Sequence, residues 1–150
     1  MTQSLSLMRV VVCCLLAAHS YGQSVRVRAI DAKTARPIVG KVIRVQLFDG
    51  PPIRQRPGYL EEKTGPDGTA SFHISGSIPL TINVSLKGGH WMQCSPYTYL
   101  AQDVMRSGAV IENQCGKPAD ISHRYSAKPG EVVIFARHWV LFNPEVHYPM

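Results

Sequence analysis

The sequence of 150 residues predicts an all-β fold, a two-layer β-sandwich of about seven short strands with one short helix. Apolar and polar residues alternate in several short segments, which is the period of a strand with one buried face. Gly, Pro and Asp separate these segments and indicate turns. Only one stretch, near position 100, has helical features.

Four segments show the alternation clearly: residues 24–29, 41–48, 70–74 and 80–86. Each has one apolar face and one polar face, so each predicted strand has a single side in the core. The residues expected to face inward are Val25, Val27 and Ala29, then Ile43, Val45 and Leu47, then Ala70, Phe72 and Ile74, and finally Leu80, Ile82, Val84 and Leu86.

The last predicted strand, residues 131–142, differs because residues 132–136 are apolar on both faces. Such a strand sits in the middle of a sheet, with its second face also covered. A Pro-Gly turn at 129–130 starts it, and residues 138–142 are expected to pack as its final part.

The predicted helix spans residues 98–107. Thr98 suits the N-cap, Gly108 suits the C-terminal end, and Leu100, Ala101 and Val104 are expected to share the apolar face.

The Pro66-Asp67-Gly68 stretch has the composition of a tight turn. A calcium loop would need oxygen ligands at alternate positions, and Lys63 and Gly65 occupy the two preceding ones. Asp67 is therefore predicted to stabilise the turn and not to bind a metal ion.

Residues 1–22 have the order of a secretory signal peptide: Arg9, then the apolar run 10–18, then small and polar residues up to Gly22. We therefore expect a secreted or periplasmic protein whose mature domain covers 23–150. Two alternatives are a buried N-terminal helix and a lipid anchor at Cys13 or Cys14. No later segment is long and apolar enough to be expected to cross a membrane.

After removal of the leader, two cysteines remain, Cys94 and Cys115. In an exported chain an even number of cysteines is most simply paired, so we expect a structural disulfide. No Cys-x-x-Cys motif or Cys/His metal spacing is present, which disfavours redox catalysis and structural zinc.

The formal net charge is +6, but the basic residues are scattered singly. Without a basic run or stripe, nucleic-acid binding is not expected. A cationic surface of this kind is compatible with anionic glycans or lipid headgroups.

Several of these segments resemble the carboxypeptidase regulatory-like domain: strand 24–29, the Pro-Ile-Val-Gly piece at 37–40, residues 64–72 and strand 80–86. The resemblance covers residues 24 to about 90, with a C-terminal extension from about 91 as in small exported bacterial proteins. It implies a prealbumin-like sandwich with no catalytic activity and no cofactor. It also implies a glycan or a cell-envelope protein as partner.

An enzyme on a related fold is a further alternative. A zinc carboxypeptidase needs His-x-x-Glu, an intradiol dioxygenase needs paired His and Tyr ligands, and a transthyretin-like hydrolase ends in Tyr-Arg-Gly-Ser; none of these patterns occurs. Metal binding is therefore not expected. The histidines considered as ligands are His73, His90, His123, His138 and His147.

The candidate binding residues are Trp91, Tyr97 and Tyr99, which cluster in sequence beside Gly88-Gly89. Sugar rings pack on exposed aromatic faces that also offer hydrogen-bonding tips. The alternative is that Trp91 plugs the end of the sandwich and the tyrosines cover the helix. A third interpretation makes the tail 140–150 a docking segment for an envelope protein, and its alternative is a C-terminal cap on the same domain.

Overall fold

The computed structural model describes residues 23–51, 53–111, 115 and 121–139. The expected signal peptide at 1–22 and the docking tail at 140–150 lie outside these described residues.

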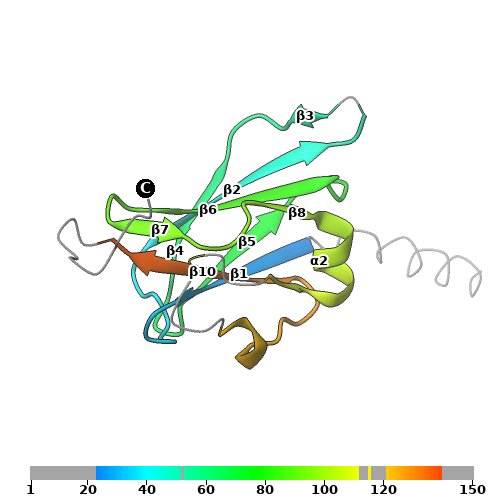
Figure 1. Ribbon diagram of the computed structural model, residues 1–150. Helices are drawn as coiled ribbons and strands as arrows, with labels where there is room; N and C mark the ends of the chain where they lie inside the picture. Colours follow the sequence, from blue (N-terminus) through cyan, green and yellow to red (C-terminus); the bar gives the residue numbers. More distant parts are fainter. Residues whose placement is uncertain (1–22, 52, 112–114, 116–120, 140–150) are drawn as a thin grey trace, which may run out of the picture.

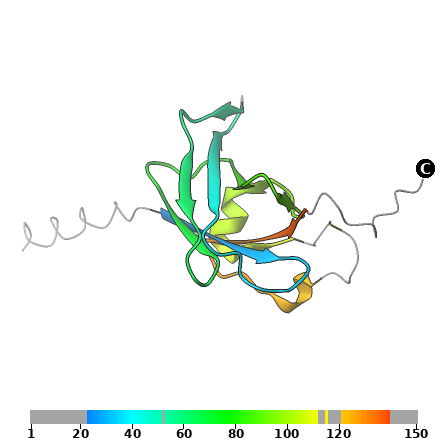
Figure 2. The same cartoon turned by 90° about the vertical axis from the view of Figure 1, so that its left-hand side faces the viewer.

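The described strands form two sheets that face each other as the layers of a sandwich (Figures 1 and 2). The sequence predicted about seven strands, whereas the described residues form ten, because strands of two or three residues are too short to show an alternating pattern. Sheet A contains β1 (Gln23–Asp31), β5 (Thr69–Ile74), β7 (Trp91–Gln93), β9 (Ala109–Val110) and β10 (Glu131–His138). Sheet B contains β2 (Val42–Asp49), β3 (Arg54–Gln55), β4 (Leu60–Lys63), β6 (Thr81–Lys87) and β8 (Thr98–Leu100).

The described strands from position 91 onward belong to both sheets. Strand order in sheet A is β5-β1-β10-β7, so β10 lies in its middle and pairs with β1 in parallel, with Val27 opposite Val132. In sheet B, β8 pairs with β6 and forms one edge. The segment expected as a C-terminal extension thus completes the sandwich.

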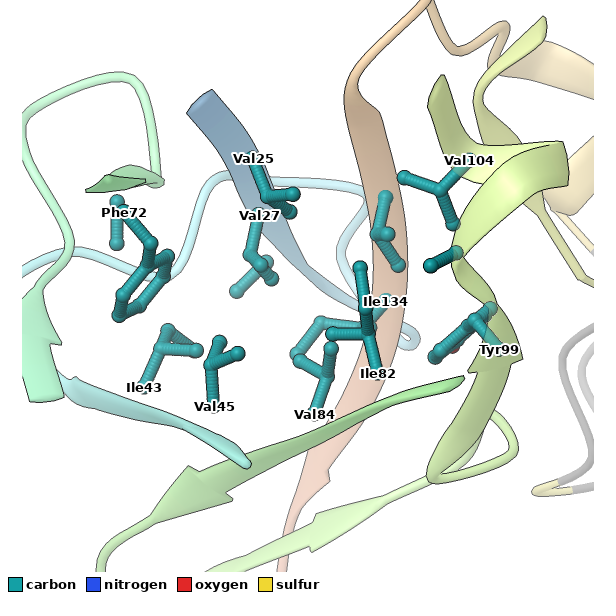
Figure 3. Close-up of a cluster of buried hydrophobic side chains, with 14 of the residues drawn as sticks. Val25, Val27, Ile43, Val45, Phe72, Ile82, Val84, Tyr99, Val104 and Ile134 are labelled. Carbon is teal, nitrogen blue, oxygen red and sulfur yellow. The ribbon is translucent and has the colours of Figure 1, made fainter. Parts of the chain in front are cut away.

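The main core lies between the sheets, and Figure 3 shows side chains from both sheets pointing toward each other. The predicted inward faces of 24–29 and 70–74 are confirmed, and so are Ile43, Val45, Ile82 and Val84, all four at 0% exposure. Leu80 is 39% exposed because it precedes the first residue of β6. Leu47 and Leu86 are partly buried at the margin of the core.

The prediction that β10 is covered on both faces is confirmed, since residues 132–136 are fully buried. A second apolar cluster covers the outer face, and Figure 2 shows the 3-10 helix η2 (Ser122–Arg124), in orange, on that side of sheet A. The expected disulfide joins Cys94 to Cys115 there, with 4.9 Å between their Cα atoms. The buried members of this cluster are Ile30, Ala32, Cys94, Ile121, Val133 and Phe135.

The helix α2 (Ala101–Ser107) begins later than predicted, because residues 98–100 pair with β6 as a strand. Thr98 is therefore not its N-cap, and Leu100 is 55% exposed instead of facing the core. Gly108 ends the helix as predicted, with φ of 76°. Neither helix in the described ranges has the length and hydropathy needed to cross a membrane.

Candidate functional site

Two distant segments meet where β7 and β10 pair in antiparallel fashion, at the left of Figure 1. The register places Trp91 opposite His138. Just beyond this pair, the main-chain N–H of Trp139 donates a hydrogen bond of 2.6 Å to the carbonyl oxygen of His90. We call these four residues, His90, Trp91, His138 and Trp139, the aromatic lip.

Three rings of the aromatic lip, those of His90, Trp91 and His138, contact one another. Trp91 and His138 meet edge to face with their centroids 5.3 Å apart, and the His90 and His138 centroids are 5.9 Å apart. Trp91 is half-buried against the main core, whereas the other three residues are exposed, Trp139 by 54%. The lip therefore combines one anchored ring with three rings open to solvent.

Local geometry explains why Trp91 is anchored. Trp91 and Gln93 share the inner face of β7, while Met92 between them is 43% exposed on the outer face. The turn before β7 is closed by a 3.1 Å hydrogen bond from the Trp91 N–H to the Gly88 carbonyl oxygen. Trp91 thus packs at the end of the sandwich, which agrees with the plug interpretation of this residue.

The structure does not bring the three predicted binding residues into one exposed surface. Tyr99 lies on β8 opposite Ile82 and is only 4% exposed in the main core. Burial raises the pKa of its phenol, and its hydroxyl has no hydrogen-bond partner in the described part of the chain. Tyr99 therefore cannot offer a ring face to a ligand.

Tyr97 is 51% exposed, but it belongs to the edge of sheet B. Its carbonyl oxygen accepts a 2.7 Å hydrogen bond from the Val84 N–H of β6, which extends the β6–β8 ladder by one step. Of the three predicted residues, only Trp91 belongs to the aromatic lip.

Sequence reasoning missed Trp139, which it assigned to packing in the last strand. That expectation was wrong for this residue, since β10 ends at His138 and the Trp139 side chain is largely exposed. The pairing of β10 with β7 is a contact between distant segments, and no local pattern in the sequence indicates it.

Asp67, which the sequence assigns to a turn, and Glu61 on β4 both have structural partners. The Asp67 Oδ1 atom accepts a 2.9 Å hydrogen bond from the Thr69 N–H, which lowers the pKa of this carboxyl and confirms its role in the turn. Glu61 binds Lys87 at 3.1 Å and Arg44 at 2.8 Å, and these bonds lower its pKa. Both carboxyls are therefore poorly suited to act as proton donors near neutral pH.

Within the described ranges, no three His, Cys, Asp or Glu side chains gather closely enough to form a metal cluster. In the aromatic lip, rings from two distant segments meet next to the exposed Trp139, and we take it as the candidate binding site.

No family model, curated protein or solved structure matches this chain.

Proposed function

We propose that this chain is an exported, non-catalytic binding module that holds a glycan against the aromatic lip. The observation that carries the proposal is the 54% exposure of Trp139, whose main chain is hydrogen-bonded to His90, the residue next to the anchored Trp91. The C–H face of a sugar packs well on an aromatic ring, and ring N–H groups can donate hydrogen bonds to its hydroxyls.

Three further features support this proposal. Trp91 is held by the core, so part of the surface is ordered before a ligand binds, which reduces the entropic cost of binding. The two exposed imidazoles offer both donors and acceptors to hydroxyl groups. The Cys94–Cys115 disulfide suits an oxidising compartment, as an exported protein would meet.

The test is a thermal-shift screen of the oxidised protein against a panel of glycans. A ligand that binds only the folded state stabilises it by about 2.7 kcal/mol at a hundred times its Kd. We expect Trp139→Ala to abolish the shift given by the bound glycan while leaving the unliganded stability nearly unchanged.

Tyr59→Ala is the matched control, because Tyr59 is 52% exposed and stacks on Arg44 in sheet B, away from the aromatic lip. A glycan shift that survives Trp139→Ala and disappears in Tyr59→Ala would move the site to sheet B. No shift with any glycan would contradict the proposal.

A second candidate function is binding to a protein of the cell envelope. It is favoured by Ile53, which is 71% exposed beside β3, where the chain stands away from the sandwich in Figure 1. Isolated exposed apolar side chains are common, but one on a projecting hairpin is well placed to contact a partner. Ile53→Asp should then prevent co-purification of an envelope protein without affecting a glycan-induced shift.

A further inference from the structure

His90 and His138 are far apart in the sequence, yet their rings lie 5.9 Å apart in the aromatic lip. We infer that these two imidazoles form a two-histidine site for a divalent transition-metal ion, with Cu²⁺ bound most tightly. Water molecules complete the coordination. The inference does not rest on glycan binding, because the metal ion alone is its probe.

The distance between the rings suits a shared ion. With a metal–nitrogen bond of about 2.0 to 2.1 Å and a further ~1.1 Å to the ring centre, two imidazoles on one ion hold their centroids about 4.5 to 6 Å apart. The observed 5.9 Å lies at the wide end of this range. Both side chains are exposed, so a small rotation can narrow the angle between the two bonds.

The surrounding backbone holds the two residues in place. The 2.6 Å bond from the Trp139 N–H to the His90 carbonyl fixes the main chain of His90 beside the end of β10. The edge-to-face contact with Trp91 limits the orientations of the His138 ring. Two ligands supplied by adjacent, hydrogen-bonded segments lose less freedom on binding than two ligands on mobile loops.

The positively charged side chains nearest in sequence to His90 and His138 do not point at the histidine pair, so they do not repel a cation there. Arg137 is opposite Met92 in the register, on the face of β10 away from His138. Lys87, just before the turn that carries His90, is bound to Glu61 at 3.1 Å. Both positive side chains are therefore directed away from the histidine pair or already paired.

The ligand type selects the class of ion. Neutral imidazole suits Zn²⁺, Ni²⁺ and Cu²⁺, whereas Ca²⁺ and Mg²⁺ require oxygen ligands. Among the nitrogen-preferring ions the general affinity order places Cu²⁺ first. An oxidising compartment, where the disulfide also persists, keeps copper in the Cu²⁺ state.

The experiment titrates the purified full chain with Cu²⁺ and follows tryptophan fluorescence and the heat of binding. The starting protein and all its variants carry Cys13→Ser and Cys14→Ser. The two cysteines that remain, Cys94 and Cys115, are joined in the disulfide, so no free thiol competes for Cu²⁺. Cu²⁺ quenches nearby tryptophans, and Trp91 lies 5.3 Å from His138, so binding at the pair is seen as quenching. We expect one ion per chain, and a loss of affinity of at least about tenfold in both His90→Gln and His138→Gln.

His73→Gln is the matched control, since His73 is an exposed histidine on β5 at the opposite edge of sheet A. The Cu²⁺ affinity of His73→Gln should equal that of the starting protein. Saturable quenching that neither lip substitution weakens would overturn the inference. So would a loss in only one of the two variants, or an equal loss in His73→Gln, or the absence of saturable binding.

Discussion

The side chain of Gln93 in sheet A accepts a hydrogen bond from the main-chain N–H of Leu86 in sheet B, with 3.0 Å between Oε1 and N. The same amide donates to the Val84 carbonyl oxygen at 3.1 Å. The ladder between β8 and β6 covers residues 81–83 and ends with the bond from the Val84 N–H to the Tyr97 carbonyl oxygen. Beyond this point the Gln93 amide supplies the hydrogen bonds that a neighbouring strand would make to β6. Gln93 thereby joins the two sheets close to the aromatic lip.

Gln93→Ala should lower the free energy of unfolding by about 1 to 3 kcal/mol, because it leaves partly buried main-chain groups of β6 without their partner. Urea denaturation measures the difference. Gln46→Ala is the control, since Gln46 lies on the outer face of β2 and should have little effect. Equal losses in the two variants would mean that the bridge between the sheets contributes nothing specific.

Gly68→Ala should destabilise the fold more than Gly58→Ala. Both glycines have positive φ, of 76° and 79°, so alanine at either position costs about 1 to 2 kcal/mol in backbone strain. A Cβ at position 68 would also meet the Ala29 carbonyl oxygen at 2.7 Å, whereas one at position 58 meets nothing within 4 Å. We expect an additional loss of about 1 to 3 kcal/mol for Gly68→Ala in denaturation experiments.

Phe72→Ala should cost about 3 to 5 kcal/mol, because Phe72 is 2% exposed and its truncation leaves a cavity between the sheets. The neighbouring His73→Ala should be nearly silent, because His73 points to solvent from the other face of β5. Thermal and urea denaturation of both variants measure this contrast. Similar effects at the two positions would contradict the register of β5.

Asp67 should add stability that depends on pH. The hydrogen bond from the Thr69 N–H lowers the pKa of Asp67 below its ordinary value of 3.8. Its contribution is therefore complete above about pH 4 and is lost as the pH falls through the lowered pKa. Asp67→Asn keeps an oxygen acceptor for Thr69 but does not titrate.

The measurement compares urea denaturation of the original protein and Asp67→Asn at about pH 6 and about pH 2.5. The original protein should lose more stability on acidification than the variant. The lowered pKa values of Asp49 and Glu61 affect both proteins alike, so they cancel in the comparison. If the free energies of unfolding of the two proteins differed by the same amount at both pH values, the pH-dependent contribution of Asp67 would be contradicted.

Reduction of the Cys94–Cys115 bond should destabilise the protein by about 3 kcal/mol, the chain-entropy value for a loop of this size. The sequence separation of the two cysteines is 21. Denaturation with and without a reductant measures the effect, and the double variant Cys94→Ala/Cys115→Ala should no longer respond. A double variant that still responds would show that the reductant acts elsewhere.

Much of the fold was predictable, because the alternation of apolar and polar residues in a half-buried strand shows which of its faces lies in the core. Val25 and Val27 face inward while Arg26 does not, and the period of two shows this without knowledge of any partner strand. The short strands β7 and β8 were not predictable, since three residues carry no measurable period. Their existence depends on β10 and β6, the long strands with which they pair.

The sequence by itself determined the all-β class, the faces of the long strands, the turn at Asp67 and the pairing of the cysteines. Only the tertiary structure decided the candidate site. It buried Tyr99 in the core, left Tyr97 at the edge of sheet B, and placed Trp91 beside His138. The physical reason is that side-chain period is a local property, whereas neighbours across a sheet are chosen by the packing of the whole chain.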